Sequence, residues 1–202
     1  MIKNIILDVG MVLVDFCWAS LLEKIGISGE TLEAVADATV RTPKWNEYDR
    51  SVQSDEELLA EFQSYAPAYA HQIQLFWDHM AGMIVQYPYA KPWIRSMKEA
   101  GYHVYILSNY ARRTYELTKA EGLSFLPLTD GAVFSFETGH IKPEKEIYHF
   151  LMDRYGLDAQ TCVFIDDNAD NLVYPKQIGW SVIQFQNFAQ VQKDLQTLGV
   201  NL

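Results

Sequence analysis

The sequence has few cysteines and no long apolar segment. Its 202 residues include only Cys17 and Cys162, which excludes a fold held together by several disulfides. The first apolar stretch is interrupted by Asp8 and Asp15, which excludes a signal peptide and a membrane span there. These absences predict a cytoplasmic protein that is not inserted in a membrane.

Basic residues are scarce, and several common catalytic motifs are missing. The chain has 16 basic and 26 acidic residues, so it lacks the basic face that binding to nucleic acids or anionic membranes requires. The Walker loop, G-x-G-x-x-G, H-E-x-x-H, paired C-x-x-C and G-x-S-x-G motifs are absent, which excludes the usual nucleotide, zinc and serine-hydrolase sites. The net charge of −10 also disfavours an anionic substrate, unless local groups offset it.

The sequence does contain a regular alternation of apolar runs and helical segments. Hydrophobic residues make up 49% of the chain, which is enough for a buried core. Short apolar runs predict strands at residues 4–14, 103–107, 132–136, 162–165 and 181–185. Helical segments, each followed by a glycine, lie at residues 92–100, 111–121, 143–155 and 169–178. This alternation predicts an α/β fold with a doubly wound, Rossmann-like parallel sheet.

Residues 16–88 differ from the rest of the chain. They show no run of β-branched residues and are rich in Ala, Glu, Leu, Gln and aromatic residues. Ser54 and Glu57 have the spacing of a capping box in front of a helical pattern. The segment therefore predicts a small all-helical cap, inserted after the first strand into a core formed by residues 1–15 and 89–202.

Polar residues follow four of the predicted strands, and such strand ends share one crevice in an open α/β sheet. They are Asp8-Val9-Gly10, Ser108-Asn109, Lys142-Pro143 and Asp166-Asp167. Three carboxylates at one edge repel one another, and carboxylate oxygens are ligands that suit Mg²⁺. Lys142 adds a positive charge, and the backbone N–H groups of Val9 and Gly10 could face an anion. The set predicts phosphoryl transfer, in which a carboxylate can form an aspartyl-phosphate.

The order of these motifs resembles that of a known family. The four sets are similar, in sequence order, to the four signature motifs of the haloacid dehalogenase-like (HAD) hydrolase superfamily. The resemblance covers the whole chain, and residues 16–88 fall where that family inserts its helical cap. Residues 8–12 and 164–171 look most like the branch that contains the glucose-1-phosphate phosphatases.

The resemblance implies a role for each motif residue. Asp8 would be the nucleophile. The Mg²⁺ ligands would be Asp8, the backbone carbonyl of Gly10, Asp167 and, through a water molecule, Asp166. The phosphoryl oxygens would be held by Ser108 and the Asn109 backbone, and Lys142 would bridge Asp8 and the phosphate.

Gly10 departs from the pattern of most phosphatases in this superfamily. They carry a second aspartate there as general acid and base, although the glucose-1-phosphatase-like branch also has glycine. A general acid contributes about 10²–10⁴-fold, so Gly10 predicts slow turnover or a good leaving group, such as the anomeric oxygen of a sugar 1-phosphate. Asp15 and His140 could replace the missing acid, and each also fits a structural or solvated role.

Five further residues have less specific patterns. Trp45, Tyr48 and Arg50 follow a proline in a polar part of the insert and are candidates to line the substrate pocket. Trp77 has the helical spacing of a core residue. Asn171 fits a solvated helix turn, or it could brace the acidic loop.

Taken together, these patterns predict a Mg²⁺-dependent phosphatase that acts on a small phosphorylated metabolite, such as the sugar phosphate glucose 1-phosphate, through an aspartyl-phosphate. Three alternatives stay open. A metal-independent haloacid dehalogenase also uses an aspartate nucleophile, but it does not need the pair Asp166-Asp167. A sugar-phosphate mutase shares the fold and the metal, but it needs a proton transfer that Gly10 does not supply. A non-catalytic ligand-binding relative would keep the fold without turnover.

Overall fold

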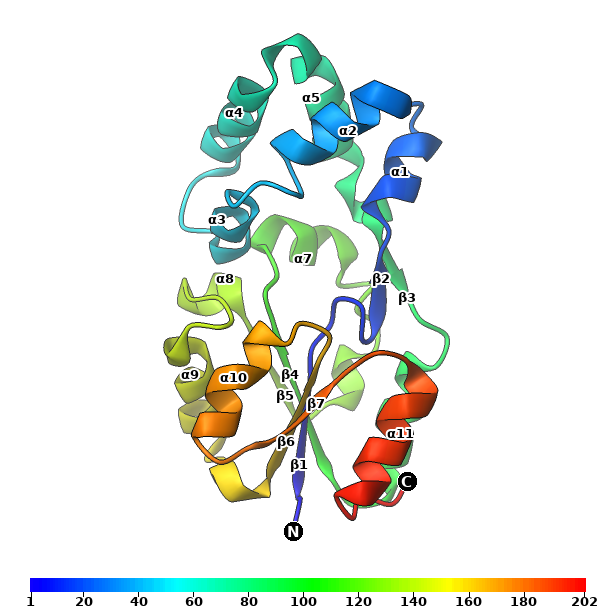
Figure 1. Ribbon diagram of the computed structural model, residues 1–202, viewed down its shortest axis with the longest axis vertical. Coiled ribbons are helices and arrows are strands. Elements are labelled where there is room, and N and C mark those ends of the chain that lie inside the picture. Colours follow the sequence, from blue (N-terminus) through cyan, green and yellow to red (C-terminus); the bar gives the residue numbers. More distant parts are fainter.

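A five-stranded sheet forms the centre of the protein, and the computed structural model describes all 202 residues (Figure 1). The strand order is β5-β4-β1-β6-β7. The strands are β1 (Asn4–Leu7), β4 (His103–Ser108), β5 (Gly131–Phe134), β6 (Cys162–Asp166) and β7 (Ser181–Gln184). All neighbouring strands of this sheet run parallel, which confirms the predicted fold class.

Helices cover both faces of this sheet. On one face, Ile5 and Leu7 belong to the same apolar cluster as residues of α6 (Ala90–Glu99) and α11 (Phe188–Thr197). On the other face, Ile6 packs with residues of α9 (Lys145–Tyr155) and α10 (Asp170–Gln177). Successive strand residues point to opposite faces, so a strand covered on both sides needs apolar residues at every position.

Between β1 and α6 the chain forms a helical layer beyond the carboxyl ends of the strands (Figure 1). Its helices are α1 (Trp18–Lys24), α2 (Gly29–Ala38), α3 (Trp45–Arg50), α4 (Asp55–Tyr65) and α5 (Ala70–His79), with short 3₁₀ turns η1 (Pro67–Tyr69) and η2 (Met80–Met83). The layer has an apolar core of its own, which includes Trp77 as predicted. The capping box of Ser54 and Glu57 is also confirmed at the start of α4.

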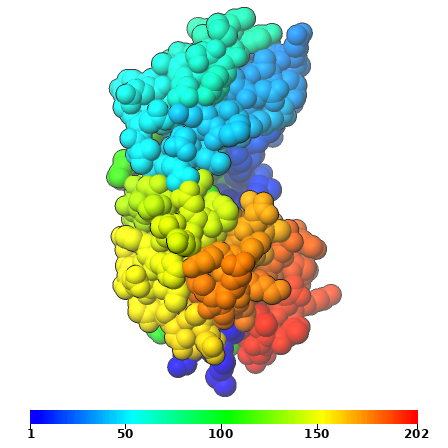
Figure 2. Space-filling model, turned by 60° about the vertical axis from the view of Figure 1, so that its left-hand side comes forward, coloured from blue at the N-terminus to red at the C-terminus, as the bar shows by residue number.

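Four short elements remain, and they connect the strands and helices of the core. They are α7 (Arg112–Thr118), α8 (Ser135–Thr138), η3 (Leu126–Leu128) and η4 (Ala159–Thr161). The α8 helix follows β5 and packs against α3. Figure 2 shows this contact, where residues near 50 meet residues near 135.

The prediction of an all-helical insert is wrong at its edges. The strands β2 (Val14–Phe16) and β3 (Ile84–Gln86) form an antiparallel ribbon at the two ends of the helical layer. Ile84 and Val85 are β-branched and pair with Phe16 and Asp15. A strand of three residues is too short to produce a recognisable alternation in the sequence, which explains the error.

Two predicted boundaries also differ from the structure. The first strand ends at Leu7, because the N–H groups of Val12, Leu13 and Val14 all donate to the carbonyl of Val9 and curl the chain. The helix predicted from residue 143 begins at Lys145, after a cis Lys142–Pro143 bond and an extended N-cap residue. No helix of the structure has both the length and the apolar character of a membrane span.

Candidate active site

A buried lysine joins two aspartates from neighbouring strands. Asp8 follows β1 and Asp166 ends β6, so the parallel sheet brings both to one edge. Lys142 comes from the loop before α9, and its Nζ lies 2.8 Å from Asp8 Oδ1 and 2.6 Å from Asp166 Oδ2. The lysine side chain is 1% exposed, so the three groups form a charged cluster that is almost closed to water.

A third carboxylate completes the cluster. Asp167 offers an oxygen that lies within 4.8 Å of oxygens of Asp8 and Asp166. Burial raises the pKa of Asp8 to about 7, with Lys142 opposing the rise and Asp166 adding to it. Burial and Asp166 also raise the pKa of Asp167. Three converging carboxylates with a single ammonium leave excess negative charge, and this oxygen set fits a hard divalent cation such as Mg²⁺.

Two asparagine side chains hold the charged groups in place. The Nδ2 of Asn109 donates to the carbonyl of Lys142 at 3.0 Å, and the N–H of Lys142 donates to Oδ1 of Asn109 at 2.7 Å. The Nδ2 of Asn171 donates to both carboxylate oxygens of Asp166, at 3.1 and 3.0 Å. Asn171 therefore braces the acidic loop, and the alternative of a solvated helix turn is wrong, because Asn171 is buried.

A cavity of about 190 Å³ opens beside these carboxylates. Polar groups reach it from Asp8, Gly10, Asn109, Asp167 and Asp49. Most of the remaining wall is apolar or aromatic, and it is formed by Met11, Val14, Phe16, Trp45, Met83, Ile84, Tyr110 and Ala111, with Thr114. The cavity thus lies between the edge of the sheet and the helical layer.

Not every residue predicted to hold phosphate lines this cavity. Gly10 and Asn109 do, whereas Val9 and Ser108 are buried and do not line it. The N–H of Val9 donates to Asp8 Oδ1 at 2.7 Å, so in this structure it orients the carboxylate. Lys142 also lies under the cavity, where it contacts both aspartates.

The three candidates from the helical layer have different positions. Trp45 lines the cavity. Tyr48 and Arg50 do not, which corrects that prediction. Tyr48 is 1% exposed, and its hydroxyl lies 2.7 Å from Oγ1 of Thr114. The guanidinium of Arg50 forms a two-pronged ion pair with Glu144 of the core, so Tyr48 and Arg50 both attach α3 to the rest of the molecule.

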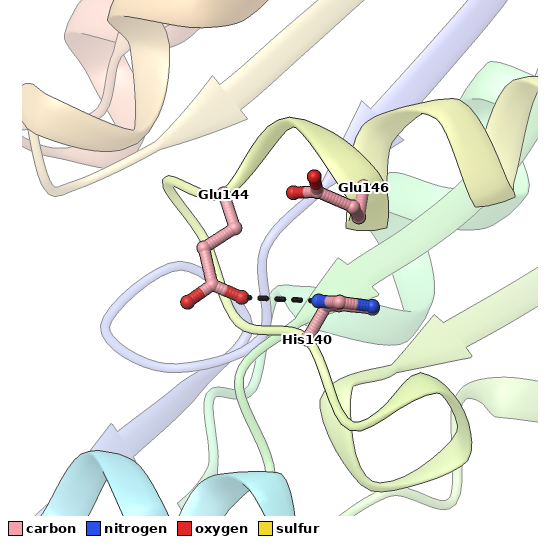
Figure 3. A group of neighbouring side chains, drawn as sticks. All are labelled: His140, Glu144 and Glu146. Atoms are coloured by element: carbon pink, nitrogen blue, oxygen red, sulfur yellow. Dashed lines mark hydrogen bonds and ion pairs between the residues drawn. The ribbon is translucent and has the colours of Figure 1, made fainter.

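Neither proposed substitute for the missing acid reaches the cavity. Asp15 lies on β2 and is not part of the cavity wall. His140 belongs to a second acidic cluster with Glu144 and Glu146, where its Nδ1 is 3.3 Å from Glu144 Oε2 (Figure 3). Glu144 is held by Arg50, and this contact is the main reason why its pKa falls to about 2. Glu144 of this second cluster is thus neutralised by Arg50 in a contact between α3 and the core.

Asp49 is the residue that the sequence reasoning missed. It lies on α3, lines the cavity with Asp8 and Asp167, and its carboxylate has no hydrogen bond or ion pair within the protein. Burial raises its pKa to about 8, with Lys142 lowering and Asp8 raising it. The polar stretch around Asp49 gives no signal of this, because the surroundings arise only when α3 docks on α8.

Comparisons with known proteins agree with this architecture. A family model described as haloacid dehalogenase-like hydrolase matches residues 12–179. A D-ribitol-5-phosphate phosphatase of Bacteroides thetaiotaomicron is 25% identical over 217 residues, which span 96% of this chain and 97% of that protein.

Two solved structures share the fold at low identity. A HAD-like family hydrolase from Porphyromonas gingivalis superposes with a TM-score of 0.76 at 20% identity, over 100% of both chains. A HAD family enzyme from Bacteroides thetaiotaomicron, in complex with magnesium and inorganic phosphate, gives a TM-score of 0.71 at 20% identity, over 95% of this chain and 99% of that one.

Proposed function

The chain belongs to the haloacid dehalogenase-like hydrolases, and we propose that within this family it is a Mg²⁺-dependent phosphatase of small phosphate esters. The observation that carries the proposal is the cluster of Asp8, Asp166 and Asp167 around the buried Lys142. A haloacid dehalogenase without a metal would have no use for this excess of carboxylates. The similar ribitol-phosphate phosphatase supports the same class of reaction.

The residues of the chain divide the chemistry between them. An oxygen of Asp8 attacks phosphorus, the phosphorus–oxygen bond to the leaving group breaks, and an aspartyl-phosphate forms. The ammonium of Lys142, 2.8 Å from Asp8, favours the ionised form of this carboxylate and would offset charge on the transferred group. Water then hydrolyses the aspartyl-phosphate and releases Asp8.

The proposed metal ligands are Asp8, Asp167, the backbone carbonyl of Gly10 and, through water, Asp166. Bound Mg²⁺ supplies positive charge that screens the phosphoryl oxygens from the attacking carboxylate. Asn171 keeps Asp166 oriented toward Lys142, and Asn109 keeps the Lys142 backbone in place. Ser108 and the Asn109 backbone are proposed to hold phosphoryl oxygens, with Lys142 bridging Asp8 and phosphate.

We propose a small sugar or polyol phosphate as the substrate. A cavity of about 190 Å³ has room for a short leaving group rather than a nucleotide or a phosphopeptide. Of its aromatic residues, Trp45 is the one that we propose as a face against which a sugar ring stacks. Residues 16–88 would act as a cap that closes this space over a core of residues 1–15 and 89–202.

The proposal is tested by measuring phosphate release from a panel that includes glucose 1-phosphate and ribitol 5-phosphate. Wild type is expected to be active with Mg²⁺ and inactive with chelator, and Asp8→Asn is expected to lose at least about 10³-fold in rate. Asp78→Asn is the matched control, because Asp78 is exposed on α5.

Several outcomes would contradict the proposal. Equal activity of wild type and Asp8→Asn, or activity that is indifferent to chelator, would exclude this mechanism. Halide release from 2-chloropropionate without Mg²⁺ would identify a dehalogenase instead. Isomerised product without net phosphate release would identify a mutase. Mg²⁺ binding without turnover of any ester would identify a non-catalytic relative.

A further inference from the structure

Gly10 leaves the proposed phosphatase without a proton donor on the sheet side of the cavity. Four residues of the cavity wall carry ionisable protons: Asp8, Asp167, Tyr110 and Asp49. Asp8 is the proposed nucleophile and Asp167 a proposed metal ligand. The hydroxyl of Tyr110 is 2.8 Å from Thr118 Oγ1 inside the core, and burial raises its pKa further. Asp49 is the one ionisable group of the wall that has neither another assignment nor a partner.

We propose that Asp49 is the general acid and base of this enzyme, acting from the helical layer on the leaving group. The inference deepens the proposed phosphatase function and depends on it. Asp8 and Asp49 line the same cavity from its two sides, since Asp8 follows β1 of the core and Asp49 lies on α3. A phosphate ester bound at Asp8 therefore directs its leaving group toward the layer that carries Asp49.

The electrostatic surroundings favour a carboxyl group that holds a proton at neutral pH. Burial is the largest cause of the raised pKa of Asp49, Asp8 adds to it, and Lys142 opposes it. Two tyrosines, Tyr48 of α3 and Tyr110 of the core, also face this carboxylate, and their hydroxyl groups carry no charge at neutral pH. The general acid of a phosphatase needs a proton to give, and these surroundings retain one.

The backbone around Asp49 is anchored to the core, which fixes the position of this residue beside the cavity. The hydroxyl of Ser135 in α8 donates to the Asp49 carbonyl at 2.7 Å. The N–H of Arg112 donates to the hydroxyl of Ser51 at 2.9 Å. Arg50 adds its ion pair with Glu144. Three contacts to the core therefore flank one catalytic side chain, which is the kind of support a proton-transfer geometry requires.

Each step balances with Asp49 as the proton carrier. When Asp8 attacks phosphorus, the electron pair of the breaking phosphorus–oxygen bond goes to the leaving oxygen, which takes the proton of Asp49. In the second step, Asp49 takes a proton from water as the water oxygen attacks the aspartyl-phosphate. The electron pair of the bond to Asp8 returns to Asp8, inorganic phosphate leaves, and Asp49 is protonated again.

The test compares Asp49→Asn with wild type on glycerol phosphate and p-nitrophenyl phosphate. The leaving groups of these two esters differ in how much they need protonation. Glycerol phosphate has a poor alkoxide leaving group, whereas p-nitrophenolate leaves without protonation. First-turnover cleavage of glycerol phosphate is expected to fall about 10²–10⁴-fold, while first-turnover release of p-nitrophenol stays within a few-fold of wild type. Because the base is also missing, phosphorylated Asp8 is expected to accumulate with the nitrophenyl ester and to be seen by mass spectrometry of the quenched protein.

Three readouts keep the inference distinct from a structural role. Equal losses on both esters, or no loss on either, would overturn it, and Asp78→Asn should match wild type on both. A carboxyl ¹³C titration of the metal-free protein that places Asp49 at an ordinary aspartate pKa would also overturn it. If wild type and Asp8→Asn hydrolyse neither ester, the phosphatase proposal fails and the inference fails with it. If wild type is active, Asp8→Asn is inactive and Asp49→Asn loses equally on both esters or on neither, the phosphatase proposal stands and only the role of Asp49 is excluded.

Discussion

Two carboxylates of the cavity, the buried Asp8 and the half-buried Asp49, lose hydration at different cost. Asp8 has the ammonium of Lys142 at 2.8 Å, so its charge is partly compensated when it ionises. Asp49 has no such partner. A buried carboxylate without a partner disfavours its charged form, and that penalty weakens the folded state whenever the group ionises.

This difference predicts an unusual pH dependence of stability at Asp49. Its pKa is about 8 in the folded protein and 3.8 as the ordinary value, so the folded state binds the proton more tightly. The contribution of Asp49 to stability is complete below about pH 4 and is lost as the pH rises through 8. Asp49→Asn should therefore gain about 1–3 kcal/mol of unfolding free energy relative to wild type between pH 5 and pH 8.

Urea unfolding of the metal-free protein at both pH values measures this gain. The same substitution at the exposed Asp78 is the control and should show no such trend. A constant difference between Asp49→Asn and wild type across this range would show that Asp49 does not hold its proton in the folded protein.

The sequence could predict the residues that the sheet positions and could not predict those that the docking of α3 positions. Asp8 and Asp166 converge because they end neighbouring parallel strands, and the apolar runs predict a parallel sheet whose strand ends share one edge. Lys142 reaches them from the loop before α9. No such rule predicts the position of Asp49. Its neighbours Ser135 and Asp8 are far away in sequence, and only the tertiary contact between α3 and α8 brings them together.

At the scale of elements, α3 is the helix that connects the helical layer to the active-site edge of the sheet. It has only six residues, too few for an isolated helix to be stable in water. Its position is instead fixed by tertiary contacts, with Tyr48 bound to Thr114 and Arg50 bound to Glu144. The helix forms because its side chains dock, and its catalytic role would depend on the same docking.

Arg50→Lys is expected to loosen this helix. Lysine cannot make the two-pronged contact of arginine with Glu144, and we expect a cost of about 1 kcal/mol because the pair is partly exposed. That cost should lower kcat/KM for a small phosphate ester about fivefold and speed amide hydrogen exchange in α3.

Arg41→Lys provides the matched control, since Arg41 makes exposed ion pairs with Glu33 and Asp37, and none of the three lines the cavity. Unchanged exchange in α3 of the Arg50 variant would show that the ion pair does not hold the helix.

Element boundaries show the same limit of sequence reasoning. The long helices and central strands could be predicted, because their apolar spacing is repeated over several turns or residues. The ribbon strand β3 and the late start of α9 at Lys145 could not. Both depend on partners elsewhere: Ile84 needs Phe16, and Glu144 needs Arg50 to fix the turn that precedes the helix.

At the scale of the whole molecule, the acidic residues act in two ways: they give the surface a negative charge, and three of them form a local cluster. The formal charge of −10 makes the surface unfavourable for large polyanions, yet Asp8, Asp166 and Asp167 are arranged to attract a cation. Mutual repulsion of these carboxylates destabilises the metal-free fold, and a bound divalent ion would relieve it.

Mg²⁺ should therefore raise the melting temperature of the protein. At about 100 times its Kd, binding stabilises by about 2.7 kcal/mol, which corresponds to about 5–10 °C for a chain of this size. Asp167→Asn should lose most of the shift in a thermal unfolding assay. Glu146→Gln, in the second acidic cluster, should keep it, because Glu144 there is already paired with Arg50. An equal shift in Asp167→Asn would place the cation elsewhere.

The ribbon of β2 and β3 brings the two ends of the inserted segment side by side. The N–H of Cys17 donates to the carbonyl of Met83 at 2.8 Å, and that of Tyr87 donates to Leu13 at 3.0 Å. Residues 17–83 therefore form one long connection between the two antiparallel strands of a hairpin, which leaves and re-enters the core at the same place. The entropy of closing such a loop rises by only about 0.6 kcal/mol for each doubling of its length. The inserted segment can therefore change in length while β1 and β4 keep their register.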